Sequence, residues 1–164
     1  MTYLRSIRWL KYVKMVDLMR TSTSRNDELN QALEALHFAY RAITSRPDAL
    51  LAKRGLSRVH HRILYFVARN PGLRMHQLLS ILQVSKQSLS APLRQLVDGR
   101  LLQVQTSEED RRVRCLHLTT RGAALEDKLS SDQRRRFARV FNKVGSKKEA
   151  AWRDIMRRLA KEDA

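Results

Sequence analysis

Apolar residues recur at helical spacing over most of the chain. Between residues 26 and about 45 they lie three or four positions apart: Leu29, Leu33, Leu36, Ala39, Tyr40 and Ile43. This spacing predicts one long helix with a broad apolar face. Asp27 and Glu28 fall in its first turn, where negative charge is favourable. We expect the helix to end before Pro47, because a proline disfavours helical backbone in the residue that precedes it.

Three shorter helical segments follow. Ser57 is expected to cap the first, which ends at Asn70-Pro71-Gly72. The second runs from Arg74 to Leu82, and a tight connection separates it from the third. Ser85 is expected to cap that third helix, which runs to about Asp98. Two helices joined by so short a turn are typical of a helix-turn-helix motif.

The apolar period changes after Gly99, a residue suited to a left-handed helix end. Short apolar runs at residues 101–104 and 113–118 flank the polar segment 105–112, which predicts a hairpin with a charged tip. Thr119-Thr120 then begins a long helix, and a final helix follows a break near Gly145-Ser146. The order of elements predicts a mainly α, winged-helix fold of the α+β type, in which a two-stranded wing follows the helix-turn-helix.

The helix that begins after Ser85 has two different faces. Apolar residues cluster on one side: Leu89, Leu93, Leu96 and Val97. The opposite side and the first turn carry short polar, basic or small side chains: Lys86, Gln87, Ser88, Ala91, Arg94 and Gln95. Glutamine can bond adenine edges and arginine or lysine can bond guanine, so this face fits a DNA major groove. Any surface helix also turns polar residues outward, and this alternative stays open from the helix alone.

The predicted wing adds a second signal for DNA. Arg111 and Arg112 lie at its tip, where a guanidinium can enter a narrow minor groove. Asp110 and Glu109 precede them, and a carboxylate there can pair with an arginine and fix the shape of the wing. We therefore expect Asp110 to stabilise the wing and the two arginines to contact DNA.

Four motifs make the resemblance to a known family specific. They are Ser85-Lys86-Gln87-Ser88-Leu89-Ser90, Leu96-Val97-Asp98-Gly99-Arg100-Leu101-Leu102, Glu109-Asp110-Arg111-Arg112 and Leu116-His117-Leu118-Thr119-Thr120-Arg121-Gly122. With them the chain resembles the MarR family of winged helix-turn-helix transcription regulators. The resemblance covers about residues 26–159 and implies an N-terminal dimerisation helix (26–55), a DNA-binding domain (56–120) and C-terminal dimerisation helices (121–164). Residues 1–25 precede them as a basic amphipathic N-terminal extension.

The resemblance also implies how such a protein acts. It implies a homodimer that binds double-stranded DNA at a roughly palindromic promoter site, with repression the expected effect. Ser85 to Ser88, Ala91, Arg94 and Gln95 would face the major groove. A small aromatic or acidic effector would bind between the dimerisation helices and the DNA-binding domain. The residues expected to line that pocket are His37, Phe38, Tyr40, Arg41 and His61.

Two features depart from the family pattern. Pro92 lies inside the predicted recognition helix, where it removes a backbone hydrogen bond and is expected to bend the helix. The basic surplus also lies largely outside the wing, because residues 133–161 hold eleven basic and two acidic side chains. A solvated dimerisation helix and a second anion-binding surface both explain that segment.

Overall charge agrees with a polyanionic partner. The 164 residues contain 33 lysines and arginines and 16 acidic residues, for a formal net charge of +17. Such a surplus favours nucleic acid first and an anionic membrane surface second. The alternative to a sequence-specific regulator is a non-specific architectural DNA-binding protein. We expect a cytoplasmic, nucleoid-associated protein without stable membrane association.

Residues 1–25 form a separate case. Arg5, Arg8, Lys11 and Lys14 recur every third position among apolar residues, a basic amphipathic pattern. This segment fits a membrane-surface helix or an arm that supports dimerisation or touches DNA. It also fits a misplaced translation start, with Met15 or Met19 as the true first residue.

Other chemistry has little support in the sequence. Cys115 is the single cysteine, so an internal disulfide and a multi-cysteine zinc site are excluded. His60 and His61 are adjacent and point about 100° apart on a helix, so one metal could hardly bind both. No glycine-rich phosphate loop or nucleophile elbow is present. We expect no metal, no cofactor and no enzymatic activity.

Overall fold

The structure is a computed structural model that describes residues 24–106 and 113–161. The chain divides into two units, residues 1–42 and residues 43–164. Helix α2 (Arg25–Ala52) begins in the first unit and ends in the second. The N-terminal extension predicted for residues 1–25 lies almost wholly outside the described residues.

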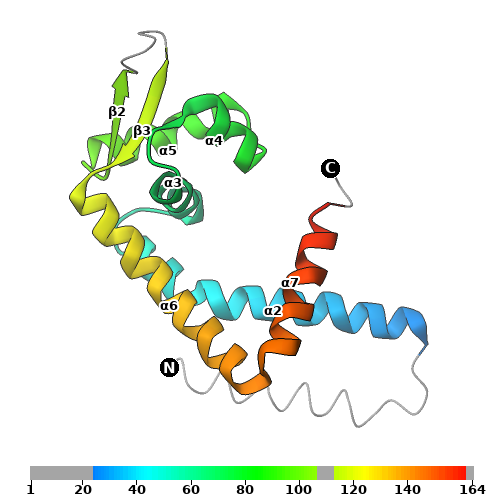
Figure 1. The fold of residues 1–164 in the computed structure, drawn as a ribbon. Helices are drawn as coiled ribbons and strands as arrows, with labels where there is room; N and C mark the ends of the chain where they lie inside the picture. The colour runs from blue at the N-terminus through cyan, green and yellow to red at the C-terminus, as the bar shows by residue number, and fades with distance from the viewer. Residues whose placement is uncertain (1–23, 107–112, 162–164) are drawn as a thin grey trace. The chain divides into compact units, whose positions relative to one another are not determined.

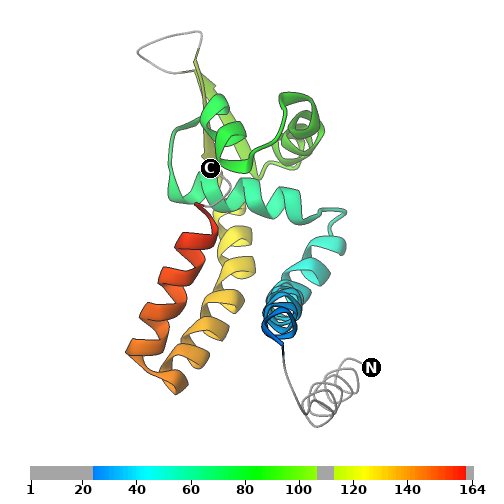
Figure 2. The same ribbon diagram turned by 90° about the vertical axis from the view of Figure 1, so that its right-hand side faces the viewer.

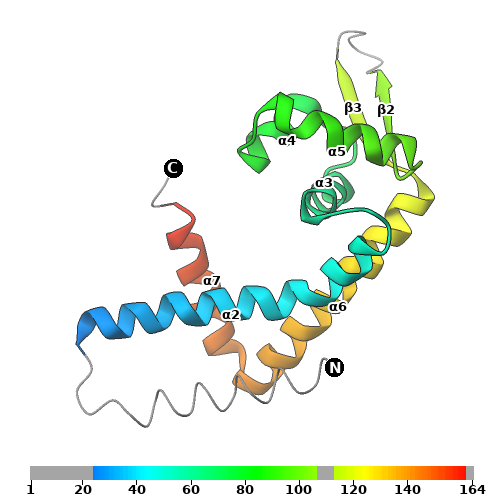
Figure 3. The ribbon, with the colours of Figure 1, turned by 180° about the vertical axis from the view of Figure 1, so that it is seen from behind.

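The second unit holds the winged helix (Figure 1). Its elements are α3 (Arg58–Arg69), β1 (Leu73–Arg74), α4 (Met75–Leu82), α5 (Lys86–Asp98), β2 (Leu102–Thr106), β3 (Arg114–Leu118), α6 (Thr120–Val144) and α7 (Ser146–Leu159). In Figure 3, α3 lies against α4 and α5, and the hairpin of β2 and β3 extends beyond them. The mainly α winged-helix prediction is confirmed.

The core of this unit lies between α3, α4, α5, the sheet and α6. Leucine dominates it, because a small domain built from helices and one short sheet is filled well by branched aliphatic side chains. The core residues are Leu51, Ile63, Leu64, Val67, Leu73, Leu78, Leu89, Leu93, Leu96, Leu102, Leu116, Leu125 and Leu129. This core fixes the positions from which α5 and the wing project.

The sheet has three antiparallel strands in the order β1-β3-β2. Leu102 pairs with Leu118 at the base of the hairpin, and Thr106 pairs with Arg114 at its outer end. The sequence predicted the two long strands. It did not predict β1, because two residues are too few to show an alternating pattern, and Leu73 becomes a strand residue only by pairing with Leu116.

Helix α2 continues through Pro47, so the prediction that it ends before this proline was wrong. A proline inside a helix leaves the carbonyl four residues earlier without its usual donor, and here that carbonyl belongs to Ile43. The side-chain amide of Gln133 on α6 donates to the Ile43 carbonyl at 3.4 Å. Pro47 itself is buried. A donor from a distant helix therefore replaces the lost backbone bond.

The end of α5 also differs from the prediction. Gly99 has φ −72°, an ordinary helical value, and the left-handed residue is Arg100 with φ 53°. The backbone N–H of Arg100 donates to the Val97 carbonyl at 2.9 Å, and that of Leu101 donates to Leu96 at 2.9 Å. The helix thus ends at Asp98 as predicted, but the left-handed residue that follows it is Arg100 and not Gly99.

Helices α6 and α7 pack through aromatic rings. Gly145 separates them, and in Figure 2 α7 (red) lies alongside the second half of α6 (orange). The ring centroids of Phe137 and Phe141 lie 5.2 and 5.4 Å from that of Trp152. These contacts explain why the predicted break near Gly145 is a turn between two packed helices.

The start of α6 requires a glycine. Thr119 caps the helix by accepting a hydrogen bond from the Gly122 N–H at 3.0 Å. A Cβ added to Gly122 would lie 1.9 Å from the Leu101 carbonyl oxygen, which itself accepts from Thr119 N–H at 3.2 Å. The backbone before β2 therefore approaches α6 more closely than any side chain permits.

Gly122→Ala is expected to lower the free energy of unfolding by about 1–3 kcal/mol, because the added methyl group forces two backbone segments apart. Urea denaturation followed by circular dichroism measures this change. Thr120→Ala, at the exposed first residue of α6, serves as the control. Its free energy of unfolding should stay within about 0.5 kcal/mol of the wild-type value. Equal stability of Gly122→Ala and wild type would show that the close approach is not needed.

Candidate nucleic-acid interface

Helix α5 separates its residues by face as the sequence predicted. Leu89, Leu93 and Leu96 are buried in the core, whereas Val97, predicted for the same side, is exposed. The polar, basic and small residues of the other face are exposed: Lys86, Gln87, Ser88, Ala91 and Arg94. Within residues 24–106 and 113–161, the side chains of Lys86, Gln87 and Arg94 make no hydrogen bond or ion pair. They are therefore available to a partner outside the chain.

The first turn of α5 is held by two serines. The Ser85 hydroxyl oxygen accepts a hydrogen bond from the Ser88 N–H at 3.2 Å, which confirms Ser85 as the cap. The Ser88 hydroxyl donates to the Ser85 carbonyl at 2.9 Å. Ser85 also donates to the Ser88 hydroxyl at 3.2 Å. Both hydroxyl protons are used inside the turn, so the serines order the helix start and can still accept a hydrogen bond.

Pro92 does not interrupt the helix. Residues Lys86–Asp98 form one α-helix that includes it, and its ring is half-buried. The exposed positions on either side of Pro92, Ala91 and Arg94, still share one face.

Gln95, which the sequence predicts to face the major groove, is exposed but hydrogen-bonded within the chain. Its side-chain oxygen lies 2.9 Å from Nε2 of His60, and its side-chain nitrogen donates to the Gly55 carbonyl at 3.0 Å. Both polar ends of the amide are thus bonded within the chain. We call these contacts of His60, Gln95 and Gly55 the α5 anchor, since they tie the middle of α5 to the turn before α3.

The geometry of the α5 anchor requires a neutral His60. The Ser57 N–H donates to Nδ1 of His60 at 3.0 Å, so Nδ1 carries no proton and Nε2 is the nitrogen that donates to Gln95. This is the reciprocal half of a capping box, with histidine in the position that glutamate or glutamine usually takes. The side chain is buried, and burial lowers the pKa of His60 below its ordinary value of 6.5.

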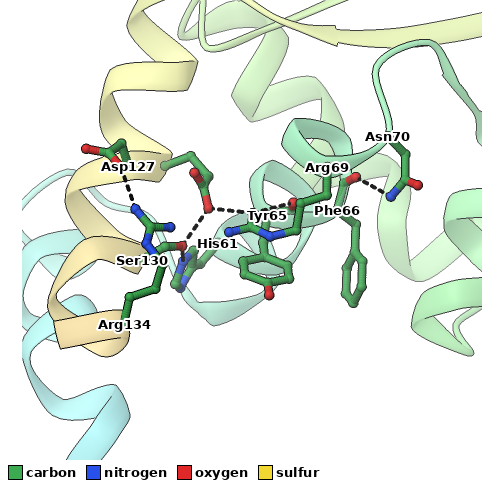
Figure 4. Close-up of polar contacts among 9 residues, drawn as sticks. His61, Tyr65, Phe66, Arg69, Asn70, Asp127, Ser130 and Arg134 are labelled. Carbon is green, nitrogen blue, oxygen red and sulfur yellow. Dashed lines mark hydrogen bonds and ion pairs between the residues drawn. The ribbon is translucent and has the colours of Figure 1, made fainter. Parts of the chain in front are cut away.

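A second polar cluster joins α3 to α6 (Figure 4). Glu126 is buried, and its carboxylate accepts hydrogen bonds from Arg69 at 2.8 Å and from the Ser130 hydroxyl at 2.5 Å. The His61 Nε2 lies 3.3 Å from the Ser130 oxygen. The Arg69 guanidinium also lies over the Tyr65 ring, 3.4 Å from its centroid. The buried carboxylate is therefore compensated by a charge and a hydroxyl.

The surroundings of His61 in this cluster change its pKa. Burial is the largest influence and lowers the pKa of His61 below 6.5, whereas the negative charge of Glu126 opposes that effect. Both histidines of the pair thus favour the neutral form in the folded protein.

Arg114, which was not predicted from the sequence to have a role in the wing, orders the base of the wing. Its guanidinium donates to the Thr106 hydroxyl at 2.6 Å across the hairpin. Only the register of the two strands reveals this pairing. The predicted wing-tip residues Asp110, Arg111 and Arg112 lie outside the described residues, and their roles stay predictions.

The residues predicted to bind an effector are distributed over both units. His37, Phe38, Tyr40 and Arg41 belong to α2 in the first unit, where the rings of His37 and Phe38 meet edge to face at 5.3 Å. His61 belongs to α3 in the second unit. The predicted pocket stays a prediction.

Comparison with known proteins identifies this arrangement. A family model described as "MarR family" matches residues 54–113, the span from the turn before α3 into the wing. The HTH-type transcriptional regulator PetP of Rhodobacter capsulatus is 40% identical over 131 residues, which cover 80% of this chain and 79% of PetP. This chain belongs to the MarR family.

Solved structures agree with this assignment. The crystal structure of a MarR family transcription regulator matches with a TM-score of 0.68 and 25% identity, over 82% of this chain and 89% of that one. NadR, solved in complex with 4-hydroxyphenylacetate, shares the fold with a TM-score of 0.61 and 24% identity, over 87% of this chain and 96% of NadR.

Membership of the MarR family makes this protein a DNA-binding transcription regulator and not an enzyme. Among the described residues, no helix is long and apolar enough to cross a membrane. The same part of the chain contains no group of three or more histidine, cysteine or acidic side chains arranged to hold a metal ion. Cys115 lies half-buried on the central strand β3.

The two neutral histidines predict a pH dependence of stability. A histidine whose pKa is lower in the folded than in the unfolded protein stabilises the fold fully above about pH 6.5, and this contribution is lost as pH falls through the folded pKa. Urea midpoints are expected to be constant from pH 8 to 7 and to fall below about 6.5.

The double variant His60→Gln/His61→Gln provides the control for this prediction. Glutamine keeps an acceptor at the capping position of residue 60 but does not titrate. Its urea midpoint should fall less between pH 7 and 5.5 than that of the wild type. An identical fall in both proteins would assign the pH dependence to other groups.

Proposed function

We propose that this MarR-family regulator binds a roughly palindromic promoter site as a homodimer and represses transcription there. The observation that carries the proposal is the exposed face of α5, where Lys86, Gln87 and Arg94 have no partner among the described residues. A helix that buries three leucines and leaves such side chains unbonded is suited to a major groove.

Four exposed side chains of α5 have distinct tasks in this proposal. Gln87 matches the donor and acceptor pair of adenine, and Arg94 matches the two acceptors of guanine. Ala91 lies between them and can contact a thymine methyl group. Lys86, in the first turn, supplies charge to a base or a phosphate. Gln95 is not included, because the α5 anchor uses its amide.

The wing completes the DNA contact in this proposal. Arg111 or Arg112 enters the minor groove beside the major groove that α5 occupies, and Asp110 fixes the shape of the wing. The Arg114–Thr106 hydrogen bond supports this assignment, because it orders the strands from which the tip extends.

Dimerisation is supported by apolar side chains that each unit leaves exposed. On α2 they recur at alternating spacings of four and three: Leu29, Leu33, Leu36 and Tyr40. This is the spacing at which one helix packs along another. On α6 and α7 the exposed apolar residues are Phe137, Val140, Val144, Trp152, Ile155 and Leu159. We propose that a second copy of the chain covers both sets.

The basic surplus of residues 133–161 fits solvated dimerisation helices. Six of its arginines lie within 4 Å of a carboxylate: Arg134, Arg135, Arg136, Arg153, Arg157 and Arg158. Ion pairs of this kind lower the positive potential of the helices.

Release from DNA by an effector is the remaining part of the proposal. His37, Phe38, Tyr40, Arg41 and His61 offer aromatic surface, imidazole and a guanidinium, which suit a small aromatic acid. In one conformation of the dimer the two α5 helices would be too close or too far apart to reach both half-sites. An effector that binds this conformation more tightly than the DNA-binding one would release the DNA. An unchanged effector response after replacement of both Arg41 and His61 would contradict this part of the proposal.

Selection of bound sequences from random duplex DNA at fixed salt tests the proposal. We expect an inverted repeat whose half-sites lie about one helical turn apart. Its affinity should exceed that of random DNA by roughly 10³-fold or more. Arg112→Ala is expected to weaken binding to the enriched site about 10-fold, a loss typical of one specific contact. Arg139→Ala on α6 serves as the control and should bind as the wild type does.

Two outcomes of the selection would contradict the proposal. Equal retention of all sequences would favour a non-specific architectural DNA-binding protein. An enriched site without inverted symmetry would argue against a dimer with two equivalent α5 helices.

Leu33→Glu tests the dimer separately. Leu33 is 66% exposed within the chain, so a charge there is harmless to an isolated protomer but costly if a second copy covers it. Sedimentation equilibrium is expected to show at least about a 10-fold higher dimer dissociation constant. Ala35→Glu places the same charge on the opposite side of α2 and should dimerise normally. A dimer dissociation constant of Leu33→Glu equal to that of the wild type would exclude this face of α2 from the interface.

A further inference from the structure

The imidazole of His60 joins the first turn of α3 to the middle of α5. His60 is only 5% exposed, so its ring has almost no contact with water. Its Nδ1 lies 3.0 Å from both the backbone nitrogen and the hydroxyl oxygen of Ser57. Its Nε2 lies 2.9 Å from the side-chain oxygen of Gln95. Both nitrogens of a buried ring are therefore occupied by partners within the chain.

The partners of His60 leave no place for a second proton on the ring. The backbone N–H of Ser57 can only donate, and it donates to Nδ1. A proton on Nδ1 would therefore set two donors against each other at 3.0 Å. The Ser57 hydroxyl can rotate and become an acceptor, but the backbone N–H cannot. Protonation of His60 thus requires the imidazolium to leave this position.

The charged groups around His60 do not compensate a positive charge on its ring. The end of α2, the turn after it, the first turn of α3 and the second half of α5 carry these charged or titratable side chains: Asp48, Lys53, Arg54, Arg58, His61, Arg94 and Asp98. Within the described part of the chain, none of them forms a hydrogen bond or an ion pair with the imidazole. Asp48 is held by Arg58 at 2.6 Å instead. Burial is accordingly the largest influence on the pKa of His60 and lowers it.

Gln95 connects the state of His60 to α5. If the imidazolium leaves, the side-chain oxygen of Gln95 loses the donor that now lies 2.9 Å away. Leucine packing and the bond from the Gln95 amide to the Gly55 carbonyl then hold α5 alone. Arg94 precedes Gln95 directly and belongs to the exposed face of the same helix. Loss of the contact with His60 therefore loosens the part of α5 that carries this arginine.

We propose that His60 is a positioning residue for DNA binding, which holds α5 in place through Gln95 only while its imidazole is neutral. DNA binds the state in which α5 is held, so DNA binding and protonation compete, with one proton for each protomer. A histidine released to solvent has an ordinary pKa of about 6.5. DNA affinity is therefore complete above this pH and falls as the pH decreases below it. The inference rests on the proposed function, because it takes α5 as the helix that contacts DNA.

Charge alone predicts a pH dependence of the opposite sign. Acid protonates exposed histidines such as His76 on α4, and added positive charge strengthens binding to phosphates. A fall in DNA affinity toward low pH in a folded protein thus requires a group whose neutral form is needed. The sign of the pH profile separates the two explanations.

Fluorescence anisotropy with a labelled duplex that carries the site selected at pH 7.5 tests the inference. We expect the dissociation constant of the wild type to rise at least about 10-fold from pH 7.5 to 5.5 at fixed salt, because fewer protomers hold α5 in place. His60→Gln keeps an acceptor for the Ser57 N–H but does not titrate. Its dissociation constant should change less than about 2-fold over the same range. Circular dichroism at each pH confirms that both proteins are folded.

Gln95→Glu changes the partner of the ring and keeps the histidine. A carboxylate at this position favours the imidazolium, so the midpoint of the affinity profile should move to higher pH by about 1 unit. Two control variants remove other histidines of the second unit, namely His61→Gln and His76→Gln. Both should retain the fall in affinity seen in the wild type.

Several results would overturn the inference. They are an affinity of the wild type that is constant or increases toward pH 5.5, an equal fall in His60→Gln, or a midpoint in Gln95→Glu that does not move to higher pH. A fall that is lost in His61→Gln but kept in His60→Gln would assign the pH dependence to the cluster around Glu126 instead.

An NMR titration of the protein without DNA separates this inference from the proposed function. The imidazole nitrogens of His60 should titrate below pH 6.5, and the amide resonances of Gln95 and Gly55 should shift with the same midpoint. Failure to select a DNA site would reject the proposed function and leave this titration to be measured. Amide resonances of Gln95 and Gly55 that stay constant while His60 titrates would overturn the inference.

Discussion

The contacts of Gln95 with His60 and Gly55 are the constraint on which the presentation of α5 depends. Leucine packing alone fixes the depth of a helix in its domain but resists rotation and sliding less strongly, because apolar contacts are not directional. The α5 anchor adds two hydrogen bonds of defined direction, at 2.9 and 3.0 Å. Side chains that read base edges must be placed to within a fraction of an ångström, and these bonds supply that placement.

Buried polar groups serve the same purpose elsewhere in the second unit. Glu126 with Arg69 and Ser130 ties α6 to α3, and Gln133 ties α6 to α2 at the Ile43 carbonyl. An apolar core of similar size would give as much stability, or more. The polar contacts instead fix which residues of neighbouring helices lie opposite each other. The orientation of α5 relative to α6 follows from this set of bonds, because α3 contacts both helices.

Much of the fold could be predicted from local signals. The spacing of leucines, the cap at Ser85, the helix start at Thr119-Thr120 and the change of period after α5 predicted the order of elements and the winged helix. The features that differ from prediction depend on residues far apart in sequence. Pro47 remains in α2 because a glutamine 90 positions away from Ile43 contacts the Ile43 carbonyl. Strand β1 exists only through its pairing with β3.

In the candidate site, too, local signals predict some features, whereas others depend on residues far apart in sequence. A helical projection places Gln87, Ala91 and Arg94 on the exposed face, because this depends only on the 3.6-residue period. It cannot show that the amide of Gln95 is already bonded, since His60 lies 35 positions earlier. Ser57 and His60, which lie three residues apart in the sequence, carry a local signal that predicts their contact. Their spacing is that of a capping box, which predicts an ordered and neutral histidine at this position.

The most direct test of this account measures affinity for every single-base variant of the selected DNA site. The measurement compares the wild type with Gln87→Ala, Arg94→Ala and Gln95→Met. The account predicts that the Gln87 and Arg94 variants lose discrimination at individual base pairs, by about 1–3 kcal/mol each. Gln95→Met should weaken binding to all sequences by a similar factor, because it loosens α5 without removing a base contact. Loss of discrimination at one base pair in Gln95→Met, with uniform weakening in Arg94→Ala, would contradict the account.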